Sequence, residues 1–225
     1  MNNSRLMTPF AGPAVGDVSL PGSKSHMNRA LLCAALSEGR SRLSGVLFAD
    51  DTEAMLEAIV VLGATVEVDR RNLEIEVTGL AGAPNFRDLV IDARSSGTTS
   101  RFLLPTLAGG TGVVTLDGAQ QLRSRPFAEQ IEALRDLGCD LEELGAPGQL
   151  PVKISSQGLE GGEVEISAET SSQFISGLML AAPLYTNGLK IKLTGVPVSR
   201  PYLELTVKVM RDFGVSVEKP DEFTY

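Results

Sequence analysis

The chain has 225 residues, of which 43% are hydrophobic and 21% charged, a composition typical of a globular protein with ample material for a core. Its formal net charge of -8 argues against nucleic acid or an anionic membrane surface as the main partner, because both require a basic face. The sequence shows neither a signal-peptide core near its start nor an apolar run of membrane-spanning length, so it predicts a cytoplasmic protein.

The cysteine and histidine content excludes several kinds of site. Cys33 and Cys139 are too few for a disulfide framework and have no neighbouring metal ligands, so we expect two reduced core thiols. His26 is the only histidine, which excludes histidine-based triads and multi-histidine metal centres. The sequence therefore predicts no metal site.

The stretch 21–29, PGSKSHMNR, stands ahead of the apolar run 30–36. A Pro-Gly turn followed by Ser and Lys places free backbone N–H groups and a cation at one helix N-terminus, which attracts anions. Ser25 and Arg29 are four residues apart, so they share a helix face with Lys24 nearby. An ordinary serine-capped helix is the alternative for this stretch alone, and the spacing is not that of a Walker loop.

Three similar helix ends recur about every 75 residues, at Gly63, Gly138 and Gly214, each a plausible helix cap before a strand. Reading outward from them predicts three units, 15–80, 86–158 and 161–225, each ordered strand, helix, strand, helix, strand, strand, with the last one truncated. The expected strands lie near 15–20, 40–47, 64–69, 72–78, 87–92, 112–117, 139–144, 151–156, 163–167, 189–195, 215–219 and, barely begun, 223–225; the expected helices lie near 25–37, 51–62, 98–108, 126–137, 171–184 and 201–213.

The two helices of each unit differ in pattern. First helices are apolar nearly all round and should be buried, although Pro105 predicts a kink or early stop in one of them. Second helices are amphipathic and should cover the outside. The fold class predicted is therefore α/β, with three repeated βαβαββ units around a pseudo-threefold axis and the apolar helices inside.

If the buried helices are roughly parallel, their N-termini meet at one end of the domain. The residues at the starts of the second helices, 123–126 and 199–202, add arginines, with a proline at the first helical position. We assign 50–52 to helix capping. The sequence thus predicts one face that binds small, multiply anionic ligands. That face gathers Lys24, Ser25, Arg29, Ser96, Gly97, Thr98, Thr99, Arg125, Ser171, Ser172, Gln173 and Arg200.

These residues occur in motifs that resemble the 5-enolpyruvylshikimate-3-phosphate (EPSP) synthase family. The resemblance runs from about Gly16 to the end in the family's order, and it covers only the first half of that enzyme. The motifs are LPGSKS at 20–25, NRALL at 28–32, SGTT at 96–99, RSRP at 123–126, SSQF at 171–174, SRPY at 199–202 and MRDFGV at 210–215.

The resemblance implies an enolpyruvyl transferase domain, an inverse α/β barrel, from an enzyme of aromatic amino acid biosynthesis. Such an enzyme transfers the enolpyruvyl group of phosphoenolpyruvate to the 5-hydroxyl of shikimate 3-phosphate through a tetrahedral intermediate and releases phosphate, without metal or organic cofactor. The herbicide glyphosate competes with phosphoenolpyruvate in the family. These ligands are anions, as the residue pattern independently predicts.

The resemblance also assigns roles to individual residues. Lys24 is implied to be catalytic and to contact phosphoenolpyruvate and glyphosate. The residues implied to bind shikimate 3-phosphate are Ser25, Arg29, Ser171, Ser172, Gln173, Ser199 and Tyr202, and those implied to bind phosphoenolpyruvate are Lys24, Gly97, Arg125, Gln173 and Ser95.

Two departures from the family pattern matter. Ser95 replaces an asparagine that contacts phosphoenolpyruvate, and serine is shorter with a single donor. The family's acid/base aspartate, glutamate and lysine lie in a second domain that this chain does not match, so we expect the chain to be inactive alone. Residues 1–14 are implied to belong to that second domain and to be poorly ordered, which leaves 15–225 as one domain.

Two alternatives stay open. A UDP-N-acetylglucosamine enolpyruvyl transferase has a similar fold, but its opening motif carries Lys-Asn where this chain has Lys24 and Ser25. A non-catalytic anion-binding module on the same fold is the other. Whether three further repeats follow Tyr225 in the gene would separate a domain of an enzyme from a module.

Overall fold

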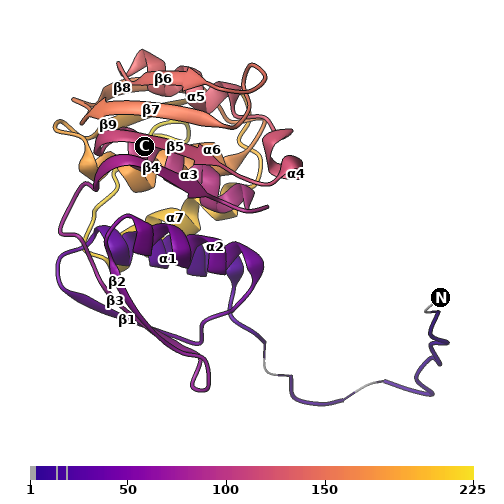
Figure 1. The fold of residues 1–225 in the computed structure, drawn as a ribbon. Helices are drawn as coiled ribbons and strands as arrows, with labels where there is room; N and C mark the ends of the chain where they lie inside the picture. The colour runs from indigo at the N-terminus through magenta and orange to yellow at the C-terminus, as the bar shows by residue number, and fades with distance from the viewer. Residues whose placement is uncertain (1–3, 14, 19) are drawn as a thin grey trace.

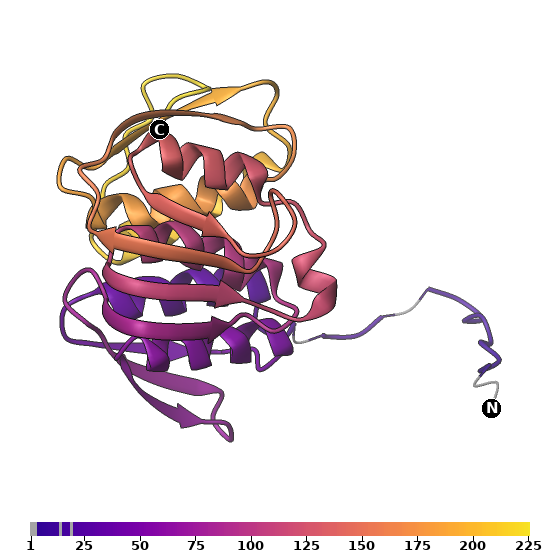
Figure 2. The same ribbon diagram turned by 45° about the horizontal axis from the view of Figure 1, so that its top comes forward.

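The computed structural model describes residues 4–13, 15–18 and 20–225. Segments 4–13 and 15–18 run away from the folded body and leave it near the start of the first helix in both views (Figure 1 and Figure 2). Their apolar side chains are exposed, Leu6 and Val15 among them. The expectation that 1–14 belongs to a second domain falls partly outside the described residues, at 1–3 and 14.

Helices and strands alternate along most of the body. The elements, in chain order, are α1 (Lys24–Leu36), β1 (Arg40–Ser44), α2 (Asp50–Val61), β2 (Thr65–Asp69), β3 (Glu74–Thr78), β4 (Asn85–Asp92), α3 (Gly97–Ala108), β5 (Thr111–Asp117), α4 (Gln120–Arg123), α5 (Ala128–Asp136), β6 (Asp140–Glu143), β7 (Val152–Gln157), β8 (Gly162–Ser167), α6 (Ser172–Ala181), the 3-10 turn η1 (Ala182–Leu184), β9 (Leu189–Thr194) and α7 (Arg200–Asp212).

The strands form three sheets. The first is antiparallel in the order β1-β3-β2, and the second is mixed in the order β4-β5-β7-β6, with β4 parallel to β5 and the other pairs antiparallel. The third is the parallel pair β8-β9. Beyond it, Phe223 and Tyr225 bond through their backbones to Leu193 and Ile191 of β9, at N–O distances of 2.7 to 3.0 Å. The α/β class predicted from the sequence is confirmed.

Helix α3 lies in the middle of the body, and every one of its residues is buried. It packs against α6, and α1 contacts both helices (Figure 1). The backbones of α3 and α6 approach closely at Gly177, where a Cβ would lie 2.3 Å from the backbone oxygen of Arg101. The prediction that the apolar helices are buried is confirmed for these two helices.

Of the two effects expected of Pro105, a kink or an early stop, the early stop does not occur, since α3 continues to Ala108, where the sequence predicts its end. A proline lacks the N–H that would bond to the carbonyl four residues earlier, here that of Arg101. The side-chain amide of Gln130, from α5, donates to that carbonyl oxygen at 2.9 Å. A long-range side chain thus satisfies the acceptor that the proline leaves open.

The three helix-ending glycines confirm their predicted role. Gly63, Gly138 and Gly214 follow α2, α5 and α7, and all three have positive φ angles, of 110°, 86° and 84°. This left-handed conformation ends a helix at little cost only in a residue without a Cβ. Local sequence therefore set these boundaries.

Other local predictions were wrong. No strand forms at 15–18 or 20, because no neighbouring strand is there to pair with, and residue 19 lies outside the described part. The strand expected near 215–219 is also absent; Val215 and Val217 pack against the core, but no sheet ladder forms there. Helix α5 begins at Ala128 and not at Pro126, and the short helix α4 was not expected.

Candidate functional site

A cavity of about 400 Å³ opens where the N-termini of α1, α6 and α7 come together. The structure brings most of the predicted site residues into its wall. The lining consists of Lys24, Ser25, Arg29, Thr98, Arg101, Arg125, Thr170, Ser171, Ser172, Gln173, Val198, Ser199 and Tyr202.

Serine residues cap the three apolar helices that lead to this region. Ser23 accepts a hydrogen bond from the backbone N–H of His26, Ser96 from that of Thr99, and Ser171 from that of Gln173. Each cap fixes the first turn of its helix and satisfies one of its unpaired donors. The N-termini of α1 and α6 line the cavity, so the remaining free N–H groups there give the cavity wall a partial positive charge.

Arg29 is the most buried charge of the site, with only 1% of its surface exposed. Its guanidinium donates to Thr206 Oγ1 (2.7 Å), the Ser25 backbone oxygen (2.8 Å), Ser176 Oγ (3.0 Å) and the Tyr202 backbone oxygen (3.3 Å). No described carboxylate forms an ion pair with it. Burial lowers the pKa of Arg29 to about 10, because the charged form loses its hydration.

A second arginine orients the glutamine of the cavity wall. Arg101 Nη1 donates to Gln173 Oε1 at 2.8 Å, and Gln173 Nε2 donates to Thr98 Oγ1 at 3.1 Å. The Arg101 guanidinium also lies over the rings of Phe174 and Phe127, at 4.7 and 5.4 Å. Burial, and then the neighbouring charge of Arg125, lower the pKa of Arg101 to about 10. Two buried cations thus face one cavity, and neither forms an ion pair with a described carboxylate, although the nearby charge of Glu129 partly opposes the lowering of the Arg101 pKa.

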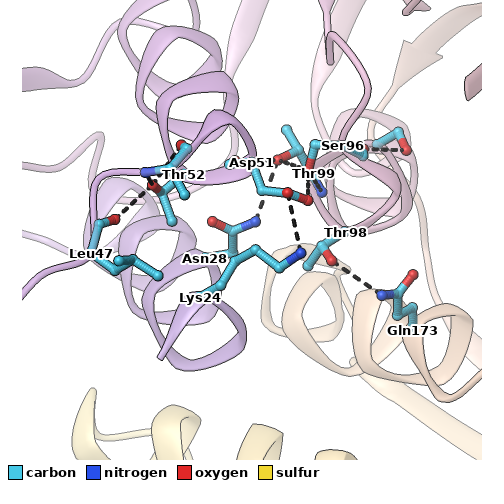
Figure 3. Close-up of polar contacts among 11 residues, drawn as sticks. Lys24, Asn28, Leu47, Asp51, Thr52, Ser96, Thr98, Thr99 and Gln173 are labelled. Carbon is cyan, nitrogen blue, oxygen red and sulfur yellow. Dashed lines mark hydrogen bonds and ion pairs between the residues drawn. The ribbon is translucent and has the colours of Figure 1, made fainter. Parts of the chain in front are cut away.

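Lys24 belongs to a polar network between α1, α2 and α3, shown in Figure 3. Its ammonium lies 3.2 Å from Asp51 Oδ2, and Ser96 Oγ donates to Asp51 Oδ1 at 2.8 Å. Thr99 Oγ1 donates to the Asp51 backbone oxygen at 3.0 Å and accepts a 3.4 Å bond from Asn28. Of the capping roles expected at 50–52, that of Thr52 is confirmed, because its hydroxyl accepts from the backbone N–H of Ala49 at the N-cap position at 2.9 Å. That of Asp51 is wrong, because its carboxylate binds Lys24 instead.

Gly97 and Ser95, both predicted to contact phosphoenolpyruvate, are not among the residues that line the cavity. Gly97 lies against Arg125, since a Cβ there would be 2.7 Å from Arg125 Nη1, so the missing side chain leaves room for that guanidinium. Ser95 is exposed and does not line the cavity, because it precedes the helix cap Ser96 and lies outside the α3 N-terminus. Arg200 is also absent from the lining, since it pairs with Glu222 at 3.3 Å.

Thr98 lies in the cavity wall, as the predicted anion-binding face implied, but the sequence analysis missed Arg101, Thr170 and Val198. For Arg101 a signal was present: a single charged residue stands in an otherwise uncharged helix, four residues after Gly97. A charge that the core tolerates at such a place points to a functional or paired group. Thr170 and Val198 lie in loops before α6 and α7, where no periodic pattern marks them.

The lining determines what the cavity can do chemically. It offers four cations, six serine or threonine hydroxyls together with that of Tyr202, and one amide, but no Asp, Glu or His. Among the described residues, no group of three or more metal-ligating side chains occurs. Nor does any described helix combine the length and apolarity needed to cross a membrane. The cavity is therefore suited to bind an anion with several oxygens rather than to exchange protons with it.

Solved structures establish the class of fold. An EPSP synthase from Acinetobacter baumannii superposes with a TM-score of 0.78 at 24% identity, covering 93% of this chain and 46% of that protein. The enolpyruvyl transferase NikO from Streptomyces tendae gives a TM-score of 0.66 at 18% identity, covering 93% and 47%. The fold is that of half an enolpyruvyl transferase.

Sequence comparison identifies the family. A sequence model described as EPSP synthase (3-phosphoshikimate 1-carboxyvinyltransferase) matches residues 11–225. The 3-phosphoshikimate 1-carboxyvinyltransferase of Shewanella loihica is 40% identical over 92% of this chain, and that of Tolumonas auensis is 40% identical over 97%. The chain belongs to the EPSP synthase family. It spans about half the length of these curated relatives, 49% and 51%.

Proposed function

We propose that this chain provides the shikimate 3-phosphate half of the active site of a 3-phosphoshikimate 1-carboxyvinyltransferase. The observation that carries the proposal is the buried guanidinium of Arg29, which lines the cavity and has no described carboxylate partner. A buried charge without a counter-ion is costly unless a ligand supplies one. Shikimate 3-phosphate has two anionic groups, a phosphate and a carboxylate, to pair with the cations, and hydroxyl groups to bond with the serines.

The proposed ligand contacts follow the cavity wall. Shikimate 3-phosphate is held by Ser25, Arg29, Ser171, Ser172, Gln173, Ser199 and Tyr202, all of which line the cavity. Phosphoenolpyruvate, or glyphosate in its place, lies at the Lys24 end, where Arg125 and Gln173 also line the cavity and Gly97 makes room for Arg125. Lys24 is the proposed catalytic residue of this half, since its cation can stabilise phosphate charge as it develops.

In the whole enzyme the 5-hydroxyl oxygen of shikimate 3-phosphate adds to C2 of phosphoenolpyruvate as that hydroxyl loses its proton and C3 gains one, and loss of phosphate and of a methyl proton then gives the product. Both proton transfers require acid/base groups. The cavity lining contains no Asp, Glu or His, which supports our proposal that these groups come from the other half of the protein and that this chain is inactive alone.

We further infer the arrangement of the domain. Residues 15–225 form one domain of three repeated units, 15–80, 86–158 and 161–225, around a pseudo-threefold axis, as in an inverse α/β barrel. Among the described residues only 86–158 shows the full βαβαββ order, with α4 added, because 15–80 lacks its first strand and 161–225 lacks its last two. The three sheets and the contacts among α1, α3 and α6 support this arrangement. We propose as partner the second domain of the enzyme, and the cytoplasm as location.

Calorimetric titration of the 225-residue chain with shikimate 3-phosphate tests the proposal. We expect saturable binding that weakens about 100-fold in Arg29→Ala, because the ligand loses a hydrogen bond to a charged group, which contributes about 1.5–3 kcal/mol. Ser171→Ala removes one neutral hydroxyl and should weaken binding about 5-fold, roughly 1 kcal/mol.

Arg87→Ala is the matched control, because Arg87 is exposed on β4 and carries the same charge away from the cavity. It should leave binding unchanged. Absence of binding by the folded wild-type chain, or equal affinities for the wild type and Arg29→Ala, would contradict the proposed site.

A further inference from the structure

The hydrogen-bond acceptors that hold the Arg29 guanidinium are all neutral oxygen atoms. Thr206 Oγ1 of α7 accepts from Nε, and Ser176 Oγ of α6 accepts from Nη2, while the other acceptors are the backbone oxygens of Ser25 and Tyr202. These bonds use four of the roughly five N–H donors of a guanidinium. One Nη1 hydrogen has no bond to the described residues and remains for a ligand.

The two hydroxyls are joined to each other behind the arginine. Thr206 Oγ1 lies 2.9 Å from Ser176 Oγ and 2.8 Å from the Tyr202 backbone oxygen, so its single hydrogen can be donated to either. Both side chains are fully buried, at 0% exposure, and neither lines the cavity. They can therefore affect a ligand only through the groups that they hold, above all Arg29, to which both are bonded.

Neutral acceptors fix the guanidinium without cancelling its charge. A carboxylate at either position would form a bidentate ion pair and neutralise Arg29 before a ligand arrives. The aromatic faces of Phe102 and Tyr202, with ring centroids 4.8 and 5.9 Å from the Arg29 carbon Cζ, stabilise the cation in the same way, without a formal negative charge.

We propose that Thr206 and Ser176 are positioning residues for anion binding, because they hold the Arg29 fork in one orientation with its charge uncompensated. This inference rests on the proposed function, in which Arg29 binds shikimate 3-phosphate. It adds to that function two residues, 177 and 147 positions away from Arg29, that never touch the ligand. Without them the guanidinium must be ordered at the moment of binding, which weakens affinity.

Two substitutions at Thr206 separate positioning from packing. Thr206→Val keeps the shape and removes the hydroxyl, whereas Thr206→Ser keeps the hydroxyl and removes a methyl group. We expect Thr206→Val to weaken shikimate 3-phosphate binding about 10-fold, the loss of one hydrogen bond to a charged group, and Thr206→Ser to bind within about 2-fold of the wild type. A packing role predicts the opposite order.

Thr106 offers a matched control within α3. It is also a fully buried helical threonine, and its hydroxyl donates at 2.9 Å to the carbonyl four residues earlier, just as Thr206 bonds to Tyr202. It makes no bond to Arg29. Thr106→Val should therefore lower thermal stability, although less than Thr206→Val, which also leaves the buried Nε of Arg29 without an acceptor, while shikimate 3-phosphate binding stays unchanged.

Ser176→Ala provides a second variant if Thr206→Val does not fold, and it should weaken binding about 5-fold by removing the acceptor of Nη2. Wild-type affinity in folded Thr206→Val or Ser176→Ala, or equal losses in Thr206→Val and Thr206→Ser, would overturn the inference. Failure of the proposed function looks different, because then neither the wild type nor any of these variants binds shikimate 3-phosphate.

Discussion

The two ends of the cavity handle positive charge in opposite ways. Arg29 is 1% exposed and bonds only to neutral oxygens, whereas the Lys24 side chain is 45% exposed and pairs with Asp51. Desolvation makes the Arg29 charge costly in the free protein, while the lysine pair remains partly in water.

This difference indicates where binding energy for an anion is stored. An anion that reaches Arg29 supplies the missing counter-charge in a low-dielectric place, where Coulomb attraction is strong. At the other end an anion competes with Asp51 for Lys24 in a hydrated place, where such pairs contribute about 0–1 kcal/mol. We therefore expect strong anion binding at the Arg29 end, where hydrogen bonds fix the cation, and weak binding at the Lys24 end, where the cation is exposed.

Exchanging the two cation types tests this comparison most strongly. Arg29→Lys keeps the charge but loses the planar fork that reaches Thr206 and Ser176 together, so we expect shikimate 3-phosphate affinity to fall about 30-fold or more. Lys24→Arg should change it less than about 3-fold, because an exposed cation tolerates another shape. Calorimetry on both folded variants measures the ratio, and similar losses at the two ends would show that the ends do not differ.

The pH dependence of binding gives a smaller effect. The anion favours protonated Arg29, whose folded-state pKa of about 10 lies below its ordinary value. We therefore expect affinity to be constant between about pH 7.5 and 9 and to fall as pH rises through about 10. The effect of Arg29 on folding stability changes with pH in the opposite direction. Above about pH 10 the unfolded chain still holds the proton that the folded chain has lost, so the contribution of Arg29 to the free energy of unfolding rises with pH.

Titrations at pH 8, 9 and 10.5 measure this profile. The buried thiols do not interfere, because burial raises the pKa of Cys33 and of Cys139 to about 12. The Arg29→Ala variant is the control and should lose most of the decline above pH 10, although Arg101, with a similar pKa, contributes the remainder. An unchanged decline in that variant would assign the effect to other groups.

Removing the carboxylate at the weak end should have the smallest effect. Asp51→Asn frees the Lys24 ammonium, and unit charges about 10 Å apart in water interact by about 0.4 kcal/mol, so shikimate 3-phosphate should bind about 2-fold tighter at low salt. The gain should vanish at high salt through screening. Asp50→Asn, the same change at a carboxylate that pairs with Arg94, is the control. Weaker binding in Asp51→Asn would mean that this carboxylate positions Lys24.

Local sequence determined the helix boundaries and the polar entries to the cavity. Ser23, Ser96 and Ser171 cap the three apolar helices, and the helix-ending glycines have positive φ angles, because caps act through bonds within a few residues. Lys24, Ser25 and Arg29 could be assigned to one site since the same chemistry recurs at each helix start and the motifs resemble a known family.

Only the tertiary structure decided how the charges of the site are held. The side chains that accept hydrogen bonds from Arg29 belong to Ser176 and Thr206, which are far away in sequence. Asp51 pairs with Lys24 instead of capping its own helix. No periodicity or short motif encodes such contacts, because they depend on which helices lie side by side after packing. For the same reason no strand forms at 15–18 or 20, where the sequence predicts one: strand propensity needs a neighbouring strand, and the described residues provide none there.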